Sequence, residues 1–428
     1  MLKEIKIKHL DEVIYYDKTE EGLPIYMWVN NKVNNFYITL NTKYGSIDTE
    51  FKLKGDKKYR KVPDGIAHFL EHVTFNEENG TSAFDYFRQF GSSINAFTSF
   101  DLTAYEVLGS SHFKENLEHL LDYVLTPCIK KAAVEKEKGI ITEEISMGDN
   151  QPRRKMLFGV YEAIFHNNKR RISIAGNKES VESTTVDDLM LAYETFYHPK
   201  NMFVVITGNF NPYEASALIK ENFSKKEFSE YKDPIRKKIK EPVEVFEKEK
   251  MITANIQIPK LEVVLKIERK MFKEKDDIKL QIYLRMILET NFGYTSDLRE
   301  ELMSKELVTS MSIASDIIDD YIIISASAET KYLVEITKIF KDKLSDLKIS
   351  KDTLNRRKKS SIANMILAYD SIETINMEIE ENIITYGRVL DDVYEIYKKV
   401  SLNELNDVIS TINTDNISVV KLVPEEDK

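Results

Sequence analysis

The stretch His68-Phe69-Leu70-Glu71-His72, within Gly65-Ile-Ala-His-Phe-Leu-Glu-His-Val-Thr-Phe75, decides how this chain is interpreted. On an α-helix, residues three and four positions apart lie on the same side, so His68, Glu71 and His72 are expected to cluster. Two imidazole nitrogens at this spacing can bind zinc at about 2.0 to 2.1 Å, and zinc then needs a third protein ligand and an open position for water. Glu71 would lie beside that water, where a carboxylate can accept its proton.

A purely structural role for this helix is the alternative. The histidines would then lie on the polar edge of a core helix whose apolar residues are Ile66, Ala67, Phe69, Leu70, Val73 and Phe75. With only 7 His in 428 residues, the pattern H-x-x-E-H arises by chance in about one such sequence in a hundred. A further metal ligand elsewhere in the chain would separate the two interpretations.

The stretch from Ala133 to Met147 offers such a ligand on a second predicted helix. Its four candidate carboxylates are Glu135, Glu137, Glu143 and Glu144. Glu137 and Glu144 are seven residues apart, two helical turns, so one of them can bind the metal while the other holds a histidine from behind. Taken alone, glutamates on a lysine-rich helix are more often solvated surface charges.

With these motifs in place, the chain resembles the pitrilysin and insulinase family of inverted zinc peptidases. The resemblance runs in order through Gly65–Phe75, Ile94-Asn-Ala-Phe-Thr-Ser99, Glu135–Met147, Ile174-Ala-Gly-Asn177, Phe196–Met202 and Val204-Val-Ile-Thr-Gly208. It implies zinc as cofactor with His68, His72 and Glu144 as ligands, Glu71 as catalytic base and Glu137 behind the ligands. It also implies that an extended substrate pairs with the strand carrying Asn95, Ala96, Phe97 and Thr98.

Two departures from the family pattern matter. The spacing from His72 to Glu144 is slightly short, which we attribute to a shortened loop at 76–81. Complete family members also carry an Arg and, seven residues later, a Tyr that bind the substrate carbonyl. Here Arg299 matches the Arg but Glu306, or Thr309 in a shifted alignment, takes the place of the Tyr. We interpret Arg299 as a solvated helix charge.

The missing Tyr of the Arg and Tyr pair predicts a partner protein. In bacterial members of the family a zinc-bearing chain often pairs with a zinc-less homologue, which supplies the Arg and the Tyr. This chain resembles the zinc-bearing subunit, so we expect a heterodimer with such a homologue, or otherwise a homodimer.

Composition excludes other classes of function. The balance of 61 basic and 71 acidic residues gives a net charge of −10, which argues against nucleic acid as a partner and favours basic peptides. The first ten residues have no apolar core of a signal peptide, and no apolar run approaches 18 residues, so no membrane span is expected. The single Cys128 is expected to be a buried, reduced thiol in a cytoplasmic protein.

The order of predicted elements favours an α+β fold. We expect strands at 13–16, 25–29, 36–40, 93–109 and 202–207, and helices from about 64, at 82–90, 113–123, 132–166 and 185–197. A charged segment with two prolines, 225–242, is typical of an exposed linker. It separates a catalytic zinc-binding domain, 1–224, from a second domain, 243–428.

The second domain repeats the first in outline. Strands at 251–258, 261–267 and 308–328 and a helix at 277–290 follow the same order, but Leu, Met and Ile around 284–288 replace the histidines. We therefore predict two homologous domains, each an antiparallel-rich sheet packed with helices, and only one with metal ligands.

These observations together indicate a bacterial zinc-dependent endopeptidase subunit that hydrolyses extended peptides. Removal of leader peptides and general peptide processing are both compatible with the sequence. The alternative is a non-catalytic interaction or scaffold subunit, because the same fold serves as structural core subunits of larger assemblies.

Overall fold

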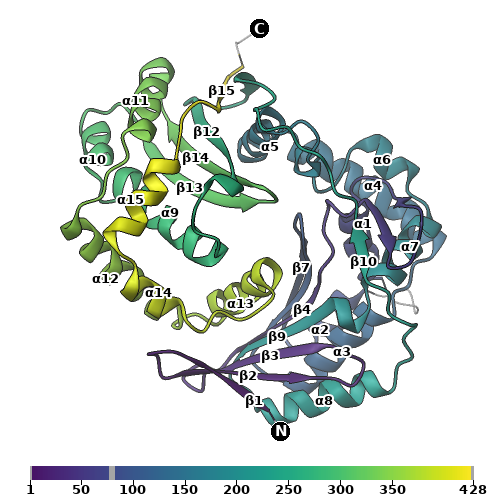
Figure 1. Cartoon of the computed structure of the whole chain (residues 1–428). Helices are drawn as coiled ribbons and strands as arrows, with labels where there is room; N and C mark the ends of the chain where they lie inside the picture. Colours follow the sequence, from purple (N-terminus) through teal and green to yellow (C-terminus); the bar gives the residue numbers. More distant parts are fainter. Residues whose placement is uncertain (1, 77–81, 426–428) are drawn as a thin grey trace. The chain divides into compact units, whose positions relative to one another are not determined.

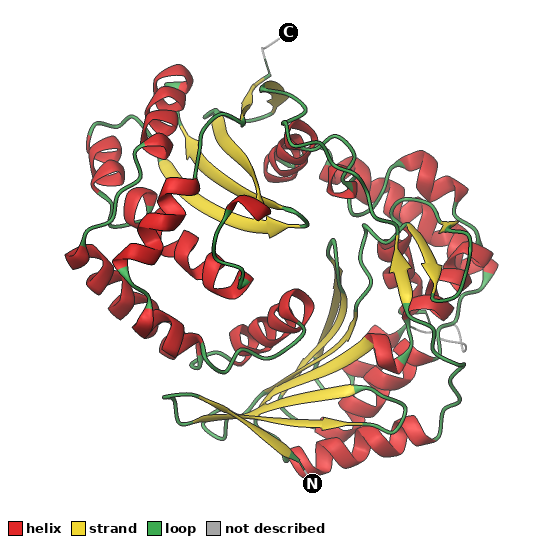
Figure 2. Ribbon diagram, viewed as in Figure 1, coloured by secondary structure: helices red, strands yellow, loops and turns green. Residues whose placement is uncertain are grey.

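The computed structural model describes residues 2–76 and 82–425 (Figure 1). Helices and strands alternate in mixed order, and the described strands form three sheets (Figure 2). The predicted α+β class is therefore confirmed. The loop predicted at 76–81 lies outside the described residues, except for Asn76. Contacts divide the chain into two compact units.

Unit 1 consists of residues 1–145, 172–238 and 365–393. Its main sheet has the order β1-β2-β3-β9-β4-β8-β7. The pairs are antiparallel except β3 with β9, which is parallel. The strands are β1 (Lys3–Ile7), β2 (Glu12–Lys18), β3 (Pro24–Val29), β4 (Phe36–Thr42), β7 (Ser93–Thr98), β8 (Thr103–Gly109) and β9 (Met202–Gly208).

The central strands of this sheet are covered on both faces. On β4, Ile38 and Leu40 point into one core cluster, while Tyr37 points into another on the opposite face, as the period of two along a strand requires. Most helices of unit 1 lie on the first face: α1 (Ile66–Thr74), α2 (Ala83–Arg88), α3 (Phe113–Leu125), α4 (Lys131–Gly148), α6 (Lys178–Ser183), α7 (Val186–Phe196) and α8 (Pro212–Ser224). The second face is covered by α13 (Ile372–Tyr386).

A small second sheet in unit 1 has the order β10-β5-β6. Its strands are β5 (Glu50–Leu53), β6 (Arg60–Lys61) and β10 (Pro234–Arg236). The strand β10 lies within the segment predicted as a linker, where Arg236 Nε donates to Asp48 Oδ1 at 2.6 Å. Part of that segment is thus paired with unit 1.

Unit 2 consists of residues 146–171, 239–364 and 394–428. Its sheet has the order β11-β15-β12-β14-β13, with bounds β11 (Glu249–Ala254), β12 (Lys260–Glu268), β13 (Ser310–Ile318), β14 (Tyr321–Glu329) and β15 (Ile417–Pro424). The helices are α5 (Pro152–Ile164), α9 (Asp277–Phe292), α10 (Asp297–Ser304), α11 (Leu333–Ser345), α12 (Lys351–Ala368), α14 (Val393–Lys399) and α15 (Leu402–Thr411). The last residues of α12, from 365 on, and the first residue of α14 belong to unit 1.

Two helices belong to a different unit from the one that chain order predicts. α5, expected with the first half, packs on the sheet of unit 2, where Met156 and Val160 share a core cluster with Val264 and Val420. α13, expected with the second half, packs on the sheet of unit 1, where the Asn376 side chain bonds the polar groups of β4 and β9. The sequence motifs could not show this exchange, because it depends on contacts between distant segments.

The helix predicted at 132–166 is broken in two. Pro152 stands at the first position of α5, where it needs no backbone N–H, and three residues separate it from the end of α4. The strand β15 was not predicted, although it pairs with both β11 and β12. Cys128 is buried and free, as predicted.

A buried lysine ties the segment before β11 to unit 2. The Lys266 side chain is fully buried, and its Nζ donates to Glu241 Oε1 at 3.0 Å and to the carbonyls of Ile164 and Pro242 at 2.9 and 2.8 Å. Three successive backbone N–H groups after α5 donate to the Glu241 carboxylate at 2.7 to 3.0 Å. The ammonium also lies 4.6 Å from the ring centroid of Tyr321.

We expect Lys266→Ala to lower the free energy of unfolding by about 3 to 5 kcal/mol, because it leaves the Glu241 carboxylate buried without its cation. Chemical denaturation measures the effect. The matched control is Lys338→Ala, which removes an exposed ion pair with Asp342 and is expected to change the free energy of unfolding little. Equal losses in both variants would contradict the assigned role of Lys266.

Candidate metal centre

The helix α1 begins at a glycine that no other residue can replace without strain. Gly65 has φ of 88°, and a Cβ there would lie 2.3 Å from the carbonyl oxygen of Ala175. From this start, the apolar side of α1 enters the core through Ile66, Phe69 and Leu70. His68, Glu71 and His72 therefore lie together on the other side, as the sequence predicts.

The helix α4 presents two of its four candidate glutamates to these histidines. Val134, Ile141 and Ile145 are buried and fix the rotation of the helix. Glu137 is 7% exposed, and Glu144 lies beside both histidines. The other two candidates, Glu135 and Glu143, are exposed to solvent.

The three donor groups have the spacing that zinc requires. Nε2 of His68 and Nε2 of His72 lie 3.6 and 3.4 Å from Oε2 of Glu144. One ligand atom from each of these residues can be chosen so that all lie within 4.8 Å of one another. Ligands on a tetrahedron with bonds of about 2.0 to 2.1 Å are about 3.3 to 3.4 Å apart. These residues could therefore hold a zinc ion after small adjustments.

Glu137 supports the centre from behind. Its Oε2 lies 3.3 Å from Nδ1 of His72, so the two ring nitrogens of His72 face different carboxylates. A carboxylate at the far nitrogen of a histidine ligand fixes the ring orientation and raises the basicity of the ligand. Burial disfavours the charged imidazole of His72, but the hydrogen bonds to Glu137 and Glu144 and the charge of Glu71 raise its pKa to about 9.

Glu71 lies one residue before this histidine and is 7% exposed. Burial raises its pKa to about 7, against the lowering effects of the hydrogen bond from Thr98 and of the charge of His72. The Thr98 Oγ1 donates to Glu71 Oε2 at 2.6 Å. This bond, which sequence reasoning missed, fixes one carboxylate oxygen. The other oxygen is the one left to act on a water.

The strand β7 carries the four residues predicted to bind substrate. It is an edge of the main sheet, since β8 is its one pairing partner among the described strands. Its Thr98 bonds Glu71, so this edge runs directly past the buried carboxylate. An extended peptide can pair with such an edge through main-chain hydrogen bonds.

Arg299, in unit 2, is not the solvated helix charge that we predicted. Its Nη1 donates to the Met311 carbonyl, and its guanidinium lies 4.9 Å from the ring centroid of the exposed Tyr294. Glu306, one of the two residues that align with the family's Tyr, follows α10 with φ of 56°. The stacking was not visible in the sequence because Tyr294 precedes Arg299 by five residues, across a helix start.

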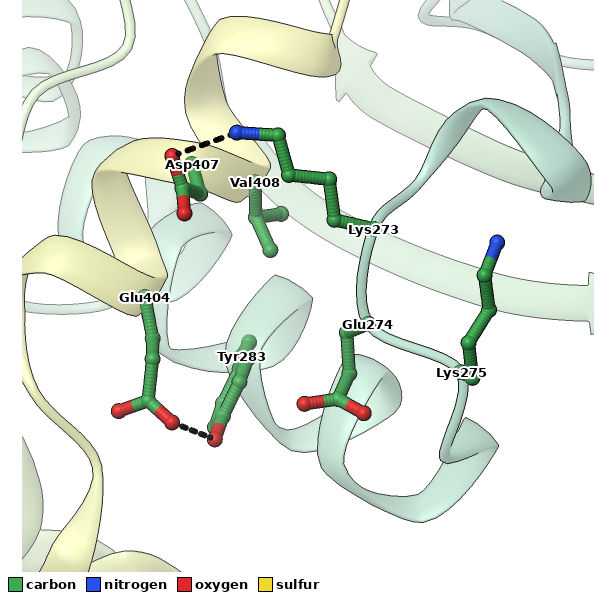
Figure 3. Close-up of a pocket in the computed structure, with 7 residues that line it drawn as sticks. All are labelled: Lys273, Glu274, Lys275, Tyr283, Glu404, Asp407 and Val408. Carbon is green, nitrogen blue, oxygen red and sulfur yellow. Dashed lines mark hydrogen bonds and ion pairs between the residues drawn. The ribbon is translucent and has the colours of Figure 1, made fainter.

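A separate pocket of about 310 Å³ lies in unit 2 (Figure 3). Two side-chain contacts join its lining groups: Lys273 Nζ donates to Asp407 Oδ1 at 3.2 Å, and the Tyr283 hydroxyl donates to Glu404 Oε1 at 2.9 Å. It offers no histidine or cysteine among its lining residues, which are Lys273, Glu274, Lys275, Tyr283, Glu404, Asp407 and Val408. Among the described residues, the group of side chains spaced to hold a metal ion is the one on α1 and α4.

Comparison with known proteins places these motifs in a family. The chain is 35% identical over 435 residues to a protein named "Uncharacterized zinc protease YmfH" of Bacillus subtilis (strain 168), covering 99% of this chain and 100% of that protein. The profile described as "Insulinase (Peptidase family M16)" matches residues 59–178. The chain belongs to the M16 peptidase family. A second profile of this family, described as "Peptidase M16 inactive domain", matches residues 183–360.

Solved M16 structures share the architecture. The crystal structure of an M16-like peptidase from Alicyclobacillus acidocaldarius has a TM-score of 0.90 and 27% identity, covering 98% of this chain and 100% of that chain. A protease from Helicobacter pylori has a TM-score of 0.81 at 19% identity, covering 96% and 99%, which shows the fold alone. The prediction of two M16-type domains is confirmed. No described helix is long and apolar enough to cross a bilayer.

We expect His72→Ala to abolish stoichiometric zinc binding, because it removes one of three ligand atoms. Glu137→Gln should weaken binding only by about 10- to 100-fold, since the ligands themselves remain. Metal analysis after dialysis against zinc buffers measures both. His9→Asn is the control, because His9 is exposed, has φ of 66° that Asn tolerates, and is remote in sequence from the centre. Undiminished zinc in His72→Ala would contradict the ligand assignment.

Proposed function

We propose that this chain is a zinc-dependent endopeptidase subunit that hydrolyses extended peptides. One observation carries the proposal: a buried glutamate with a pKa of about 7 lies between a three-ligand cluster of metal-binding type and an open sheet edge. The zinc protease relatives support it. Cutting peptides in the cytoplasm, by removal of leader peptides or by general processing, is the role we infer.

The ligands in this proposal are His68, His72 and Glu144, with Glu137 orienting His72. A zinc ion held there would polarise a peptide carbonyl and lower the pKa of a bound water toward about 7. With two imidazoles and one carboxylate as its protein ligands, the ion would keep a position open for that water. The unbonded oxygen of Glu71 supplies the proton acceptor.

Glu71 takes the proton of the attacking water and passes it to the leaving amine. A group with a pKa near 7 both accepts and donates a proton readily at neutral pH. Thr98 holds the carboxylate in place during both transfers, because its hydroxyl bonds the other oxygen. General bases of this kind typically contribute about 10² to 10⁴-fold to the rate.

The substrate backbone extends the sheet beside Asn95, Ala96, Phe97 and Thr98. Their strand is an edge, and its last residue bonds Glu71, which supports placing the scissile bond near Thr98. Recognition through main-chain groups would accept many sequences, as a processing enzyme requires.

A zinc-less homologue completes the enzyme in this proposal. The position of the family's Tyr holds Glu306 or Thr309, so an Arg and a Tyr would have to come from another chain. The chain covers 47% of the solved chain of pitrilysin and 48% of that of PqqL from Escherichia coli, two structures that share its fold at 17% identity. A homodimer is the second arrangement considered.

A non-catalytic scaffold subunit is the alternative. Complex III of Candida albicans contains a chain with the same fold, with a TM-score of 0.72 at 16% identity. The inactive-domain profile, however, matches residues 183–360, which contain none of the proposed ligands. The proposed ligands and Glu71 all lie in the other matched segment, 59–178, which favours the peptidase.

We expect Glu71→Gln to retain zinc and lose peptide hydrolysis by at least about 10² to 10⁴-fold, because an amide does not accept the proton at neutral pH. Metal analysis and cleavage of an unstructured peptide library are measured on the same sample. Glu135→Gln is the control, since Glu135 is an exposed glutamate on the same helix as Glu144. Full turnover by zinc-replete Glu71→Gln would assign the base to another residue.

We expect the purified chain alone to hydrolyse peptides slowly. Its turnover rate should rise about 10² to 10³-fold when a zinc-less homologue with the Arg and Tyr is added, because the loss of one oxyanion-stabilising residue typically lowers turnover by that factor. Turnover is titrated against the homologue, and the complex is measured by light scattering. A specific pair should bury more than about 1,000 Å². If the chain alone hydrolyses peptides at ordinary enzyme rates and no homologue changes them, the heterodimer is rejected in favour of a self-sufficient homodimer.

A further inference from the structure

A carboxylate that none of the proposed steps uses lies one strand in from the open edge. Glu106, on β8, stands opposite Asn95 on β7, and Asn95 Nδ2 donates to Glu106 Oε2 at 3.3 Å. On its other side Glu106 stands opposite Thr39 of β4, whose hydroxyl donates to Asn376 of α13 at 2.9 Å. Glu106 therefore lies between α13, which covers the middle of this face, and the open edge of the sheet at β7.

The face matters because side chains alternate along a strand. Ile94 and Ala96 of β7 point into the core beneath α1, while Phe97 belongs to the cluster on the face of α13. Asn95 and Glu106 share that second face, since they are bonded to each other. A peptide strand added beside β7 would direct every second side chain to the same face.

The charge on this face is not balanced. Among the described residues, no lysine or arginine forms an ion pair with Glu106 or Glu380, and Glu380, on α13, is 3% exposed. No described group donates a hydrogen bond to the buried Oε1 of Glu380. Burial raises the pKa of Glu380 to about 7, against the lowering effect of hydrogen bonds from Thr39 and Asn41, and the charge of Glu106 adds to the rise. The groups that bond Glu106, the Asn95 amide and the Tyr37 hydroxyl, are neutral.

We propose that Glu106 gives the β7 edge a preference for peptides that carry a lysine or arginine opposite Asn95. The inference rests on the proposed function in one respect: it takes β7 as the edge to which the peptide adds. It names a specificity determinant that the metal centre does not require.

The distances support this assignment. Neighbouring strands lie about 4.7 to 4.9 Å apart, so the backbone of an added strand would be about 9 to 10 Å from that of β8. The four-carbon stem of a lysine, with the Glu106 side chain extended toward it, spans this gap, whereas alanine does not. Asn95 precedes Thr98 by three residues, about 10 Å along a strand, so the basic residue should lie about three positions from the bond beside Glu71.

Binding of labelled peptides to the zinc-free full-length chain tests the proposal without turnover. The probes are twelve-residue alanine- and threonine-based peptides, either neutral or with one lysine moved through the sequence, measured by fluorescence anisotropy at low salt. We expect the best lysine peptide to bind about tenfold more tightly than the neutral one, the size of a charge-assisted hydrogen bond. The ratio should fall as salt is added, since the site is partly exposed.

Two variants assign the preference to Glu106. Glu106→Gln should reduce the ratio to about one, and Glu106→Lys should reverse it in favour of peptides with glutamate at the same position, a gain that misfolding cannot produce. Glu4→Gln removes an exposed carboxylate from β1, the opposite edge of the sheet, and should leave the ratio unchanged.

An unchanged ratio in Glu106→Gln, an equal loss in Glu4→Gln, or no binding of any peptide would each overturn the proposal. Cleavage by the zinc-loaded chain with its partner is scored separately. Charge-dependent binding without cleavage would reject the peptidase and keep the subsite, and cleavage without charge dependence would do the reverse.

Discussion

The contact of His72 with two carboxylates is the interaction on which the centre depends. Its Nδ1 faces Glu137 and its Nε2 faces Glu144, so rotation of the ring would break both contacts. Both carboxylates come from α4, two turns apart, and the buried Ile141 between them holds the register of that helix. Apolar packing thus fixes the rotation of α4, and the rotation of α4 fixes which glutamates reach the histidines.

The same arrangement concentrates negative charge. Glu71, Glu137 and Glu144 lie around two imidazoles, and this excess is why His72 binds a proton more strongly than an ordinary histidine. Neutral imidazole is the form that binds a metal, so a divalent cation held here would displace that proton. Such a cation would also stabilise the charged form of Glu71. The site is therefore matched to a divalent ion by its charge as well as by its distances.

Much of this centre could be predicted from the sequence, because its geometry is local. H-x-x-E-H on one helix and a seven-residue spacing on another depend only on helical periodicity. The spacing alone did not decide which glutamate lies beside both histidines; the rotation of α4, set by its buried residues, places Glu144 there. The bond from Thr98 to Glu71 was not predicted, since it joins a strand to a helix 27 residues earlier. Pro152 could have marked the end of the long predicted helix, because proline favours a first helical position.

The exchange of α5 and α13 could not be predicted and has a physical consequence for how the chain folds. Gly159 of α5 approaches β11 so closely that a Cβ would lie 2.2 Å from Ile252 Cδ1, so this helix is fitted to the sheet of unit 2. Asn376 of α13 bonds buried groups of β4 and β9, so that helix is fitted to the sheet of unit 1. Each sheet therefore has one face covered by a helix from the other half of the chain. A cut within 225–242 would leave a first half without α13, exposing the Tyr37 and Val205 face beside Glu106. The proposed metal ligands and every strand of this sheet lie in the first half, but the second face of the sheet is covered by α13 only when the second half has been made.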